Sequence, residues 1–502
     1  MNRNSMLEAV RDRVEPWDLI VVGGGATGAG CALDAASRGL DVLLLERGDF
    51  GEGTSSRSTK LIHGGVRYLE QGNLSLVREA LAERGRLRNN APQHVKTQPF
   101  IVPCYSYFEI AYYGAGLKFY DLLSGKQSFG KSRILSKKTT IERLPEVETE
   151  GLRGGIEYFD GKFDDTRLLL ELIVNAVQHG ATVLNYARVD YLSKTDDKKI
   201  NGVEFECVEK GERFTPKARA VINATGSLVD SLRIRSDSDA ERLISASRGV
   251  HLVFECSVLN SETALMIPKT DDGRVLFAIP FYEHVLVGTT DVPVDDPTRE
   301  TSASEEEIDF ILETMAGYFK TAPARNDIKS VFAGIRPLVK DGSARNTSTL
   351  SRGHTIVVDI SGLVTVTGGK WTTYRNMAED AVSRAVEIAG FSTGPSKTKE
   401  LKLSHSFDFE TIGLEQKISK EFDWTYADVV RSVRFEMART VEDVLARRTR
   451  LLFLDAVAAV DAAPITAELI AAELGYGVDW IENQIEEFER VALNYSPKGS
   501  FR

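Results

Sequence analysis

The chain has 502 residues, of which 42% are hydrophobic, and its formal net charge is −11. This length is typical of about two or three domains. The acidic balance argues against a nucleic-acid partner, because binding to a phosphate backbone needs clustered basic charge.

The four cysteines lie far apart and form no C-x-x-C pair, which favours a reducing compartment and predicts no metal site. Residues 1–17 mix basic and acidic side chains and lack the apolar stretch of a signal peptide. No window approaches the ~20 apolar residues of a transmembrane helix. We therefore expect the protein in the cytoplasm or on a membrane face.

The first predicted element is a buried parallel strand at residues 18–22, which runs into a glycine motif. Gly23, Gly25 and Gly28 form the pattern G-x-G-x-x-G. Its first two glycines let the backbone turn and approach a pyrophosphate, and its third lets helix and strand pack closely. The helix predicted at residues 29–38 points its positive end at such a phosphate.

A second strand at residues 41–45 ends at Glu46, which is placed to accept hydrogen bonds from a ribose. The glycine pattern alone is a weak signal. Strand, glycines, helix, strand and acid in this order favour a dinucleotide site. Residues 51–72 are rich in Ser, Thr and Gly and predict a loop, whose hydroxyl-rich part at 53–58 suits hydrogen bonding to a cofactor.

The later elements alternate between two kinds of domain. The pattern predicts helices at 73–90, 167–179, 304–320 and 373–388, a buried strand at 220–222, antiparallel strands at 251–254, 275–279 and 285–289, and strands at 355–359 and 363–367. Because nucleotide-binding signals flank the antiparallel strands, the two domains exchange chain rather than sit end to end.

The best domain boundary falls at residues 392–400, and residues 415–492 carry an almost entirely helical pattern. Within that region, Thr440 is expected to cap a helix at 441–454. Arg447, Arg448 and Arg450 are expected on the outside of this helix.

Three further features favour a flavin over a nicotinamide cofactor, which needs only the first β-α-β unit. A buried strand runs into Asn223-Ala224-Thr225-Gly226, the hydroxyl-rich loop follows Glu46 closely, and Gly368-Gly369-Lys370 opens a late helix. Each feature alone is more often a turn or a helix cap. Together they indicate a long cofactor lying across the fold.

Further motifs occur in a characteristic order along the chain. They are the Thr-Ser-Ser-x-Ser-Thr-Lys run at 54–60 and the stretches 61–69 (LIHGGVRYL), 287–291 (VGTTD), 334–338 (GIRPL) and 368–375 (GGKWTTYR). The chain thereby resembles FAD-dependent glycerol-3-phosphate dehydrogenases, with matched motifs over roughly residues 17–500.

The resemblance implies an α/β fold: a glutathione-reductase-like (Rossmann-type) FAD-binding domain interleaved with an antiparallel-sheet substrate domain, plus a C-terminal α-helical domain. It places an FAD-dependent oxidoreductase region at 15–392, with FAD-binding parts at 15–95, 150–235 and 335–392, substrate-binding parts at 96–149 and 236–334, and a helical cap domain at 393–502.

The same resemblance implies a reaction: oxidation of sn-glycerol 3-phosphate to dihydroxyacetone phosphate by hydride transfer to FAD, with reoxidation by a membrane quinone, ubiquinone or menaquinone. Motif and resemblance together give the predicted cofactor-binding residues. These are Gly23, Gly25, Ala26, Thr27, Gly28, Glu46, Arg47, Thr54, Ser55, Ser56, Ser58, Lys60, Leu61, Val189, Ala224, Thr225, Gly226, Gly369, Lys370, Trp371 and Thr372.

The catalytic candidates follow from the chemistry of this reaction. A phosphate dianion is best held by arginine, whose planar fork matches the phosphate oxygens. Arg336 and Arg352, the latter in the run 350–354 (LSRGH), lie in segments that resemble the family's substrate-binding stretches, and Arg67 follows the Gly64-Gly65 turn. Arg336 is flanked by apolar residues in a strand-like run, so an unpaired guanidinium there would need an anion.

The proton acceptor stays open between His63 and His251, since imidazole titrates near the working pH. His251 is as often a strand histidine with a satisfied hydrogen bond. Lys370 is expected near the flavin, where it stabilises negative charge or assists proton transfer. Thr373 either hydrogen-bonds substrate or flavin or caps the following helix.

Residues 111–143 combine an aromatic and aliphatic stretch with a following basic one that includes Lys126, Lys131 and Lys138. This favours an interfacial docking surface, with peripheral binding to the inner face of the cell membrane. The alternative is a helix packed on the core followed by a solvated loop. The sequence leaves the oligomeric state open, a homodimer included.

Three other functions compete with the quinone-linked dehydrogenase. A glycerol-3-phosphate oxidase would pass the electrons to O2 and release H2O2, but the long polar insertion expected of that branch is absent from the sequence. An amine or amino-acid oxidase on the same fold would not need the arginines as phosphate ligands. A catalytically silent nucleotide-binding protein would recruit partners through its C-terminal helices.

Overall fold

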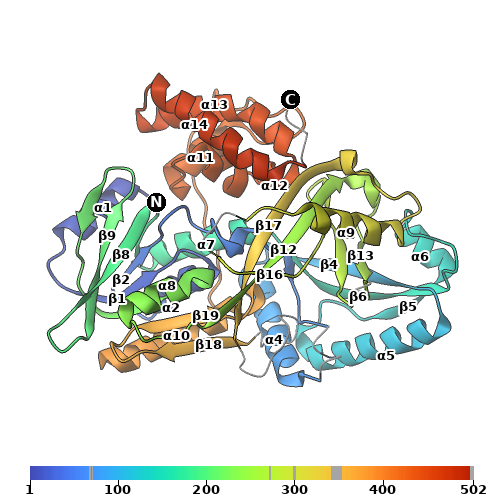
Figure 1. Cartoon of the computed structure of the whole chain (residues 1–502), viewed down its shortest axis with the longest axis horizontal. Coiled ribbons are helices and arrows are strands. Elements are labelled where there is room, and N and C mark those ends of the chain that lie inside the picture. The colour runs from blue at the N-terminus through green and yellow to red at the C-terminus, as the bar shows by residue number, and fades with distance from the viewer. Residues whose placement is uncertain (67–68, 70–71, 271–272, 298–300, 341–352, 498–502) are drawn as a thin grey trace.

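The computed structural model describes the chain apart from residues 67–68, 70–71, 271–272, 298–300, 341–352 and 498–502. Figure 1 shows three parts: a sheet with its helices on the left, a larger sheet on the right and a group of helices above both. Arg67 and Arg352, two of the predicted substrate residues, lie outside the described residues.

The first part is built on a six-stranded sheet in the order β18-β19-β11-β1-β2-β7. Its strands are β1 (Trp17–Val22), β2 (Val42–Leu45), β7 (Thr182–Leu184), β11 (Ala218–Asn223), β18 (His354–Val358) and β19 (Val364–Gly368). All neighbouring pairs are parallel except β18 with β19. Apart from the half-buried edge strand β18, the strands are almost wholly buried, as expected of a parallel sheet covered on both faces.

Helices α2 (Ala26–Ser37), α7 (Asp165–Gln178) and α10 (Tyr374–Ala389) share one hydrophobic core with one face of this sheet. The other face packs on a small antiparallel sheet of β8 (Ala187–Lys194), β9 (Ile200–Cys207) and β10 (Glu212–Phe214), and on α1 (Arg3–Asp12). The sheet is thereby enclosed on both faces, and its strand ends remain available for a ligand.

The second part is a ten-stranded sheet in the order β16-β12-β15-β14-β13-β4-β6-β3, with β17 paired to β12 and β5 to β6. Its strands are β3 (Leu61–Ile62), β4 (Val95–Cys104), β5 (Arg133–Ser136), β6 (Gly154–Phe163), β12 (Ile244–Glu255), β13 (Ala264–Ile267), β14 (Leu276–Phe281), β15 (His284–Gly288), β16 (Val292–Val294) and β17 (Ile328–Val339). The predicted boundaries assign the residues of β6 to the FAD-binding part, whereas the strand lies in this second sheet.

The helices around this second sheet are α4 (Leu74–Asn90), α5 (Tyr107–Ser124), α6 (Lys137–Arg143) and α9 (Glu305–Ala316), whereas α8 (Val229–Ser236) packs against β8 and β19 of the first part. Short 3-10 turns are η1 (Thr54–Ser56), η2 (Gly125–Gln127), η3 (Gly226–Leu228), η4 (Cys256–Val258), η5 (Arg325–Asp327), η7 (Trp371–Thr373) and η9 (Leu493–Tyr495). The predicted helices at 73–90, 167–179, 304–320 and 373–388 are confirmed as α4, α7, α9 and α10.

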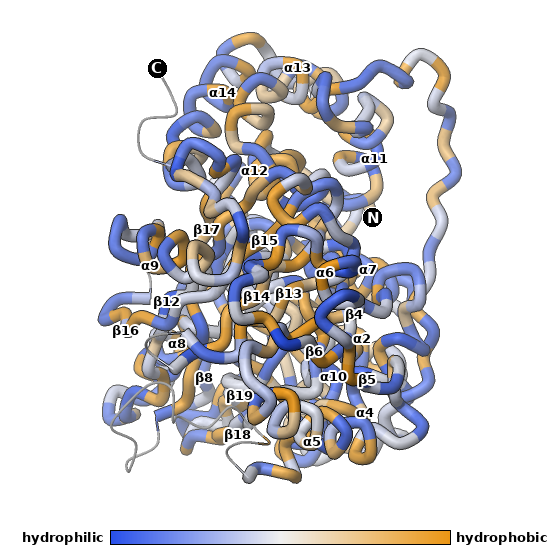
Figure 2. The backbone as a smooth tube through the Cα atoms, turned by 90° about the vertical axis from the view of Figure 1, so that its right-hand side faces the viewer, coloured by the Kyte–Doolittle hydropathy of each residue, from blue (hydrophilic) through white to orange (hydrophobic). Residues whose placement is uncertain are grey.

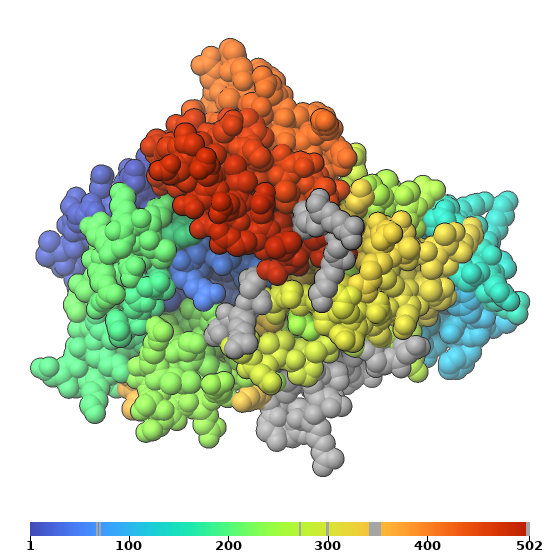
Figure 3. Space-filling model, turned by 45° about the horizontal axis from the view of Figure 1, so that its top comes forward, coloured from blue at the N-terminus to red at the C-terminus, as the bar shows by residue number. Residues whose placement is uncertain are grey.

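The third part consists of α11 (Tyr426–Glu436), the π-helical segment η8 (Asp443–Arg448), α12 (Leu451–Leu454), α13 (Ala456–Leu474) and α14 (Val478–Ala492). The chain reaches it through a segment that rises along one side of the molecule (Figure 2). In the space-filling view this C-terminal domain, red and orange, sits across the two sheet-containing parts (Figure 3).

The prediction of one helix at 441–454 with its arginines outside is wrong. The helix is interrupted, because Arg450 takes a left-handed conformation with φ of 65° after η8. Arg447, Arg448 and Arg450 are almost completely buried. Helical periodicity assigns charged side chains to the solvent, and it carries no information on carboxylates that another part of the chain supplies.

Candidate active site

A cavity of about 560 Å³ opens where the neighbouring parallel strands of the six-stranded sheet end. It is lined by Val22 at the end of β1, Leu45 at the end of β2, Ala224 just after β11 and Gly368 at the end of β19. Ligands of open α/β sheets bind at such carboxyl ends. Segments that lie far apart in the sequence therefore meet around this cavity.

The glycine motif forms the floor of this cavity. A Cβ at Gly28 would lie 1.8 Å from the carbonyl oxygen of Gly23, so only glycine lets α2 start so close to β1. Gly23 adopts φ of 110°, and a Cβ there would lie 2.6 Å from the Ala224 carbonyl oxygen. The motif thus brings bare backbone and the N-terminus of α2 to the cavity wall.

Glu46 lines the same cavity at the end of β2. Its carboxylate accepts hydrogen bonds from the Gly24 N–H at 2.5 Å and the Gly48 N–H at 3.1 Å. Burial raises the pKa of Glu46, against the lowering effect of these two bonds. The side chain is therefore held in place by backbone donors at the position where the sequence predicts a ribose ligand.

The hydroxyl-rich loop closes the cavity against the second sheet. The Thr54 hydroxyl donates to the Ile335 carbonyl oxygen at 2.6 Å, which joins the loop to β17. The Ser55 hydroxyl accepts from the Ala26 N–H at 2.9 Å, and the Ser55 carbonyl oxygen accepts from the Trp371 indole at 2.9 Å. The loop thus links the start of α2, the ten-stranded sheet and η7 around the cavity.

The late Gly-Gly-Lys corner forms one end of the cavity. Gly368 and Gly369 have φ of 77° and 66°, left-handed values that favour glycine, and Lys370 lines the cavity next to them. The Thr373 hydroxyl donates to the Lys370 carbonyl oxygen at 3.2 Å and accepts from the Lys370 N–H at 3.3 Å. Thr373 therefore fixes this turn, although its hydroxyl makes no capping hydrogen bond to the following helix α10.

His63 lies beside this corner through its backbone. Its N–H donates to the Thr372 hydroxyl at 3.3 Å, and its carbonyl oxygen is 3.4 Å from the same hydroxyl. The next amide, Gly64 N–H, donates to the buried Tyr120 hydroxyl at 2.8 Å. The structure thus brings the predicted His63 turn and the predicted Lys370 turn together.

Strands β12 and β17 bring His251 and Arg336 to one face. His251 pairs with Phe332 and Ser247 with Arg336, so alternate residues along both strands share a face. On β12, Gly249 lies between His251 and Ser247, the residue that pairs with Arg336. A Cβ there would lie 2.3 Å from the Arg336 guanidinium, so the glycine gives that side chain room.

The guanidinium of Arg336 has protein partners. Its Nη2 donates to the Thr289 hydroxyl at 3.0 Å, and its Nη1 lies 3.4 Å from Asp291 Oδ1 and 3.3 Å from the Arg248 carbonyl oxygen. The sequence argument for an unpaired guanidinium at this position is wrong, because Asp291 comes from a distant part of the chain. The side chain is 23% exposed, so part of it faces outward.

His251 is held in a dry environment. Its Nε2 is 3.0 Å from the Thr59 hydroxyl, and its ring stacks on Phe332 with centroids 4.7 Å apart. Burial, aided by the charges of Lys60 and Arg336, lowers the pKa of His251 well below 6.5. The imidazole is therefore neutral at neutral pH, the form in which it can accept a proton.

Most of the predicted cofactor residues line the cavity. Those that do so are Gly23, Gly25, Ala26, Thr27, Glu46, Arg47, Thr54, Ser55, Val189, Ala224, Thr225, Gly226, Gly369, Lys370 and Trp371. The others, Gly28, Ser56, Ser58, Lys60, Leu61 and Thr372, lie behind it. For example, Lys60 Nζ donates to Asp165 at 2.7 Å and to the Ser56 carbonyl oxygen at 2.6 Å.

The cavity also includes residues that sequence reasoning missed. They are Glu52, Arg57, Arg188, Asp190, Ser227, Ser231, Arg235, Ile335 and Pro337, among others. Several are sequence neighbours of predicted residues such as Val189 and Gly226. This proximity in sequence was the one indication that they line the cavity. Ile335 and Pro337 flank Arg336 on a strand of the other sheet and reach the cavity because β17 passes it.

Residues 18–375 match the family described as FAD dependent oxidoreductase, and residues 383–480 match the family described as the C-terminal domain of alpha-glycerophosphate oxidase. The mitochondrial glycerol-3-phosphate dehydrogenase of Rattus norvegicus is 38% identical, over 98% of this chain and 75% of that protein. The chain belongs to the FAD-dependent glycerol-3-phosphate dehydrogenase family.

Solved structures agree with this assignment. The glycerol-3-phosphate dehydrogenase of Bacillus halodurans, solved with FAD, matches with a TM-score of 0.78 and 28% identity, over 100% of this chain and 98% of that chain. The L-alpha-glycerophosphate oxidase of Mycoplasma pneumoniae matches with a TM-score of 0.61 and 18% identity, over 79% of this chain and all of that chain, which shows the fold alone.

The predicted α/β fold with an FAD-binding domain and a C-terminal helical domain is confirmed for this dehydrogenase family member, as is FAD as its cofactor. The residues present fit FAD. Glycine backbone and a helix N-terminus suit a pyrophosphate, Glu46 suits a ribose, and the Gly369-Lys370 corner remains for the flavin.

Proposed function

We propose that this chain oxidises sn-glycerol 3-phosphate to dihydroxyacetone phosphate, and that a membrane quinone then reoxidises its FAD. The observation that carries the proposal is that Arg336 and His251 share one face of β12 and β17. Strand β17 is joined to the hydroxyl-rich loop at the cofactor cavity by the Thr54–Ile335 hydrogen bond. The proposed phosphate-binding Arg336 and proton-accepting His251 thereby lie on two paired strands, of which β17 borders the cofactor cavity.

FAD, when bound, supplies the chemistry by accepting a hydride at its N5 atom. The outward part of the Arg336 guanidinium binds the substrate phosphate, while Asp291 and Thr289 hold its inner side. His251 Nε2, oriented by the Thr59 hydroxyl, is the proposed acceptor of the hydroxyl proton, and His63, whose backbone bonds the Thr372 hydroxyl, is the alternative. Lys370 stabilises negative charge that develops next to the flavin.

The reaction is tested by anaerobic bleaching of the flavin absorbance. Glycerol 3-phosphate should bleach it, whereas glycerol and amino acids should not. Arg336→Leu should retain FAD but lose bleaching by glycerol 3-phosphate, since the phosphate is then unpaired. Arg384→Leu, an exposed arginine of α10, is the control and should bleach as the unaltered protein does. Bleaching by an amino acid, or normal bleaching of Arg336→Leu, would overturn the proposal.

The electron acceptor is tested in a second step. After bleaching by glycerol 3-phosphate, a soluble quinone analogue should restore the absorbance much faster than dissolved oxygen does. The match of residues 383–480 to the C-terminal domain of an oxidase makes the oxygen reaction the second candidate. Fast reoxidation by oxygen with stoichiometric hydrogen peroxide would favour that candidate.

We also propose that α5 docks the protein on the inner face of the cell membrane. The outward residues Phe108, Tyr112, Phe119 and Leu122 follow helical spacing and form one apolar stripe, with Phe108 76% and Leu122 75% exposed. Lys118 interrupts this surface, and the exposed basic residues nearby are Lys126, Lys131, Arg133, Lys137 and Lys138. Such a face suits the boundary of an anionic membrane.

Across the described part of the chain, no helix is both long enough and apolar enough to span a bilayer. The docking proposal is tested by sedimentation with vesicles. The holoenzyme should bind vesicles containing phosphatidylglycerol better than vesicles of phosphatidylcholine alone. The double change Phe108→Ser and Leu122→Ser should abolish binding, whereas Ile412→Ser and Val478→Ser, on other exposed apolar positions, should not. Equal binding by both pairs would refute the role of α5.

A further inference from the structure

The C-terminal domain inserts three arginines into the body of the molecule within four residues. Arg447 and Arg448 end the π-helical segment η8, and Arg450 follows in a left-handed conformation. Their exposures are 3%, 0% and 0%. A buried guanidinium needs charged or hydrogen-bonding partners. The contacts of these three arginines therefore show which parts of the chain the segment binds.

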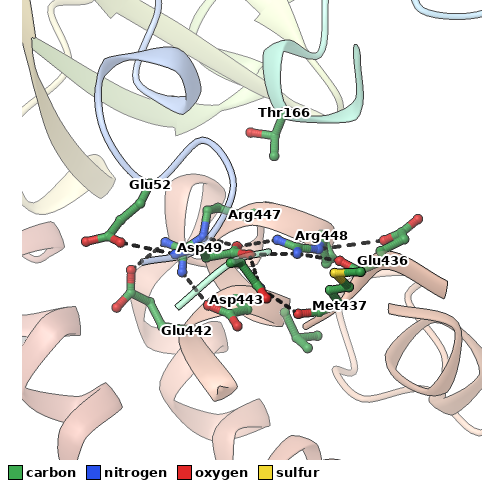
Figure 4. A network of polar contacts seen from close by, with 12 residues as sticks. Asp49, Glu52, Thr166, Glu436, Met437, Glu442, Asp443, Arg447 and Arg448 are labelled. Carbon is green, nitrogen blue, oxygen red and sulfur yellow. Dashed lines mark hydrogen bonds and ion pairs between the residues drawn. The ribbon is translucent and has the colours of Figure 1, made fainter. Parts of the chain in front are cut away.

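Two of these arginines grip one carboxylate. Arg447 Nε lies 2.6 Å from Asp49 Oδ2, Arg448 Nη2 lies 2.8 Å from Asp49 Oδ1, and Arg448 Nη1 also contacts Asp49 (Figure 4). Arg448 Nη2 donates in addition to the Glu436 carbonyl oxygen at 2.8 Å. Asp49 is fully buried and both of its oxygens are engaged, so its position is closely fixed.

Asp49 belongs to the loop between β2 and η1, which carries cofactor residues on both sides of it. Glu46 precedes it by three positions, and Gly51 to Ser55 follow it along the cavity wall. Within the loop, the Asp49 N–H donates to Glu52 Oε2 at 3.3 Å, and the Gly51 N–H donates to the Gly24 carbonyl oxygen at 3.1 Å. Moving Asp49 would therefore move residues that line the cavity.

Arg450 holds the other end of the same loop. Its Nη2 donates to the Ser56 carbonyl oxygen at 2.7 Å and to Asp165 Oδ1 at 3.2 Å. Asp165 Oδ2 accepts from the Ser58 hydroxyl at 2.7 Å and the Ser58 N–H at 3.1 Å. The cavity-lining stretch is thus tied at Asp49 and again at Ser56–Ser58, in both cases to arginines of the C-terminal domain.

We propose that Arg448 and Arg450 are positioning residues for the cofactor, and that through them the C-terminal domain sets the affinity of the protein for FAD. Buried ion pairs add little net stability compared with apolar packing, whereas their directional bonds fix geometry. By linkage, FAD binding must then stabilise the arginine segment as much as that segment favours FAD binding.

The experiment measures FAD binding rather than turnover, so its result is independent of the proposed substrate. Deflavinated full-length Arg448→Met and Arg450→Met should bind FAD more weakly by about tenfold or more in fluorescence titration. Arg38→Met is the matched control, because the Arg38 side chain is 4% exposed and pairs with the buried Asp34 at 2.5 Å, at the end of α2 that points away from the cavity. That control should lose thermal stability but keep its FAD affinity.

A purely structural role predicts a different result. In that case the apo melting temperature of Arg448→Met falls, but the dissociation constant for FAD and the rise in melting temperature on adding FAD stay unchanged, which would overturn the proposal. Arg448→Lys retains the charge without the fork and should recover part of the affinity.

If the methionine variants do not fold, hydrogen exchange on the unaltered protein decides. Adding FAD should slow exchange in the peptide that spans 443–450 by several-fold, and it should leave the exposed helix α14 unaffected. Unchanged exchange in the 443–450 peptide would overturn the proposal.

Discussion

Glu52 shows how the cofactor loop responds to pH at the scale of a single residue. Its Oε2 accepts from the Asp49 N–H, and the carboxylates of Glu442 and Glu46 lie near. Burial, assisted by these two carboxylates and opposed by Arg447, raises the pKa of Glu52 from 4.5 to about 7. Between these two pH values the folded protein therefore binds more protons than the unfolded chain.

We expect Glu52 to make the free energy of unfolding of the apo-protein fall as the pH rises from 4.5 to about 7, with no further contribution above that range. Glu52→Gln should remove this part of the pH profile, because the amide keeps the shape without titrating. Thermal denaturation over a pH series measures it. Glu8→Gln, on the exposed side of α1, should leave the slope as it is, and the same result for Glu52→Gln would refute the assignment.

Some site residues were predictable one by one. Glu46, Gly23 and Gly25 line the cavity because the spacing of the motif encodes a local β-α-β geometry, which needs no distant contact. The surroundings of Arg336 were not predictable, since Asp291 and Thr289 reach it only after β17 has paired with β12. The partners of a buried charge are set by tertiary structure.

At the scale of elements, α5 has two faces with different roles. Its outer face carries the proposed docking stripe, while its inner face carries Tyr120. The Tyr120 hydroxyl lies 3.0 Å from Asp160 Oδ1 and accepts from the Gly64 N–H at 2.8 Å, beside the His63 turn. Arg84 completes this buried group by pairing with Asp160. The helix therefore also supports an active-site turn.

Tyr120→Phe should test that support. Removing the hydroxyl leaves the Gly64 amide without its closest partner, so we expect a loss of about 1–3 kcal/mol in the free energy of unfolding. The Michaelis constant for glycerol 3-phosphate should also rise, since the turn next to His63 is loosened. Denaturant titration and steady-state kinetics measure the two effects. Tyr191→Phe, at an exposed position of β8, is the control, and equal behaviour of the two variants would refute this account.

Periodicity predicted long amphipathic helices such as α4, α7 and α10, because one apolar face is a local property of the sequence. It failed at η8, where Arg447 and Arg448 are buried together with the apolar Val444, Leu445 and Ala446. It also gave no sign that β6 joins the ten-stranded sheet, because strand partners far apart in sequence are chosen by the fold.

At the scale of the whole molecule, the hydrophobic core of the C-terminal domain extends onto the ten-stranded sheet. Val253, Phe281, Leu286 and Phe332 of the substrate sheet lie in the same hydrophobic cluster as residues of α11 to α14. The Ser330 hydroxyl also donates to the Leu452 carbonyl oxygen at 2.9 Å across this junction. The sheet therefore covers part of the apolar surface of these helices.

A fragment of residues 393–502 should accordingly fail to fold by itself, because it would expose the surface that the sheet covers and separate Arg448 and Arg450 from Asp49 and Asp165. Circular dichroism and proton spectra of the purified fragment measure this. The full chain should unfold in a single calorimetric transition. A cooperative transition of the isolated fragment, or a separate transition for this domain in the full chain, would contradict the shared core.

The sequence by itself determined the cofactor class, the interleaved order of the two sheet-containing parts and the main helices, because glycine spacing and apolar periodicity act over a few neighbouring residues. The tertiary structure alone decided which carboxylates meet Arg336, Arg448 and Arg450, and that the C-terminal domain reaches the cofactor loop. Ion pairs between residues hundreds of positions apart form only when the chain has folded, and no local pattern encodes them.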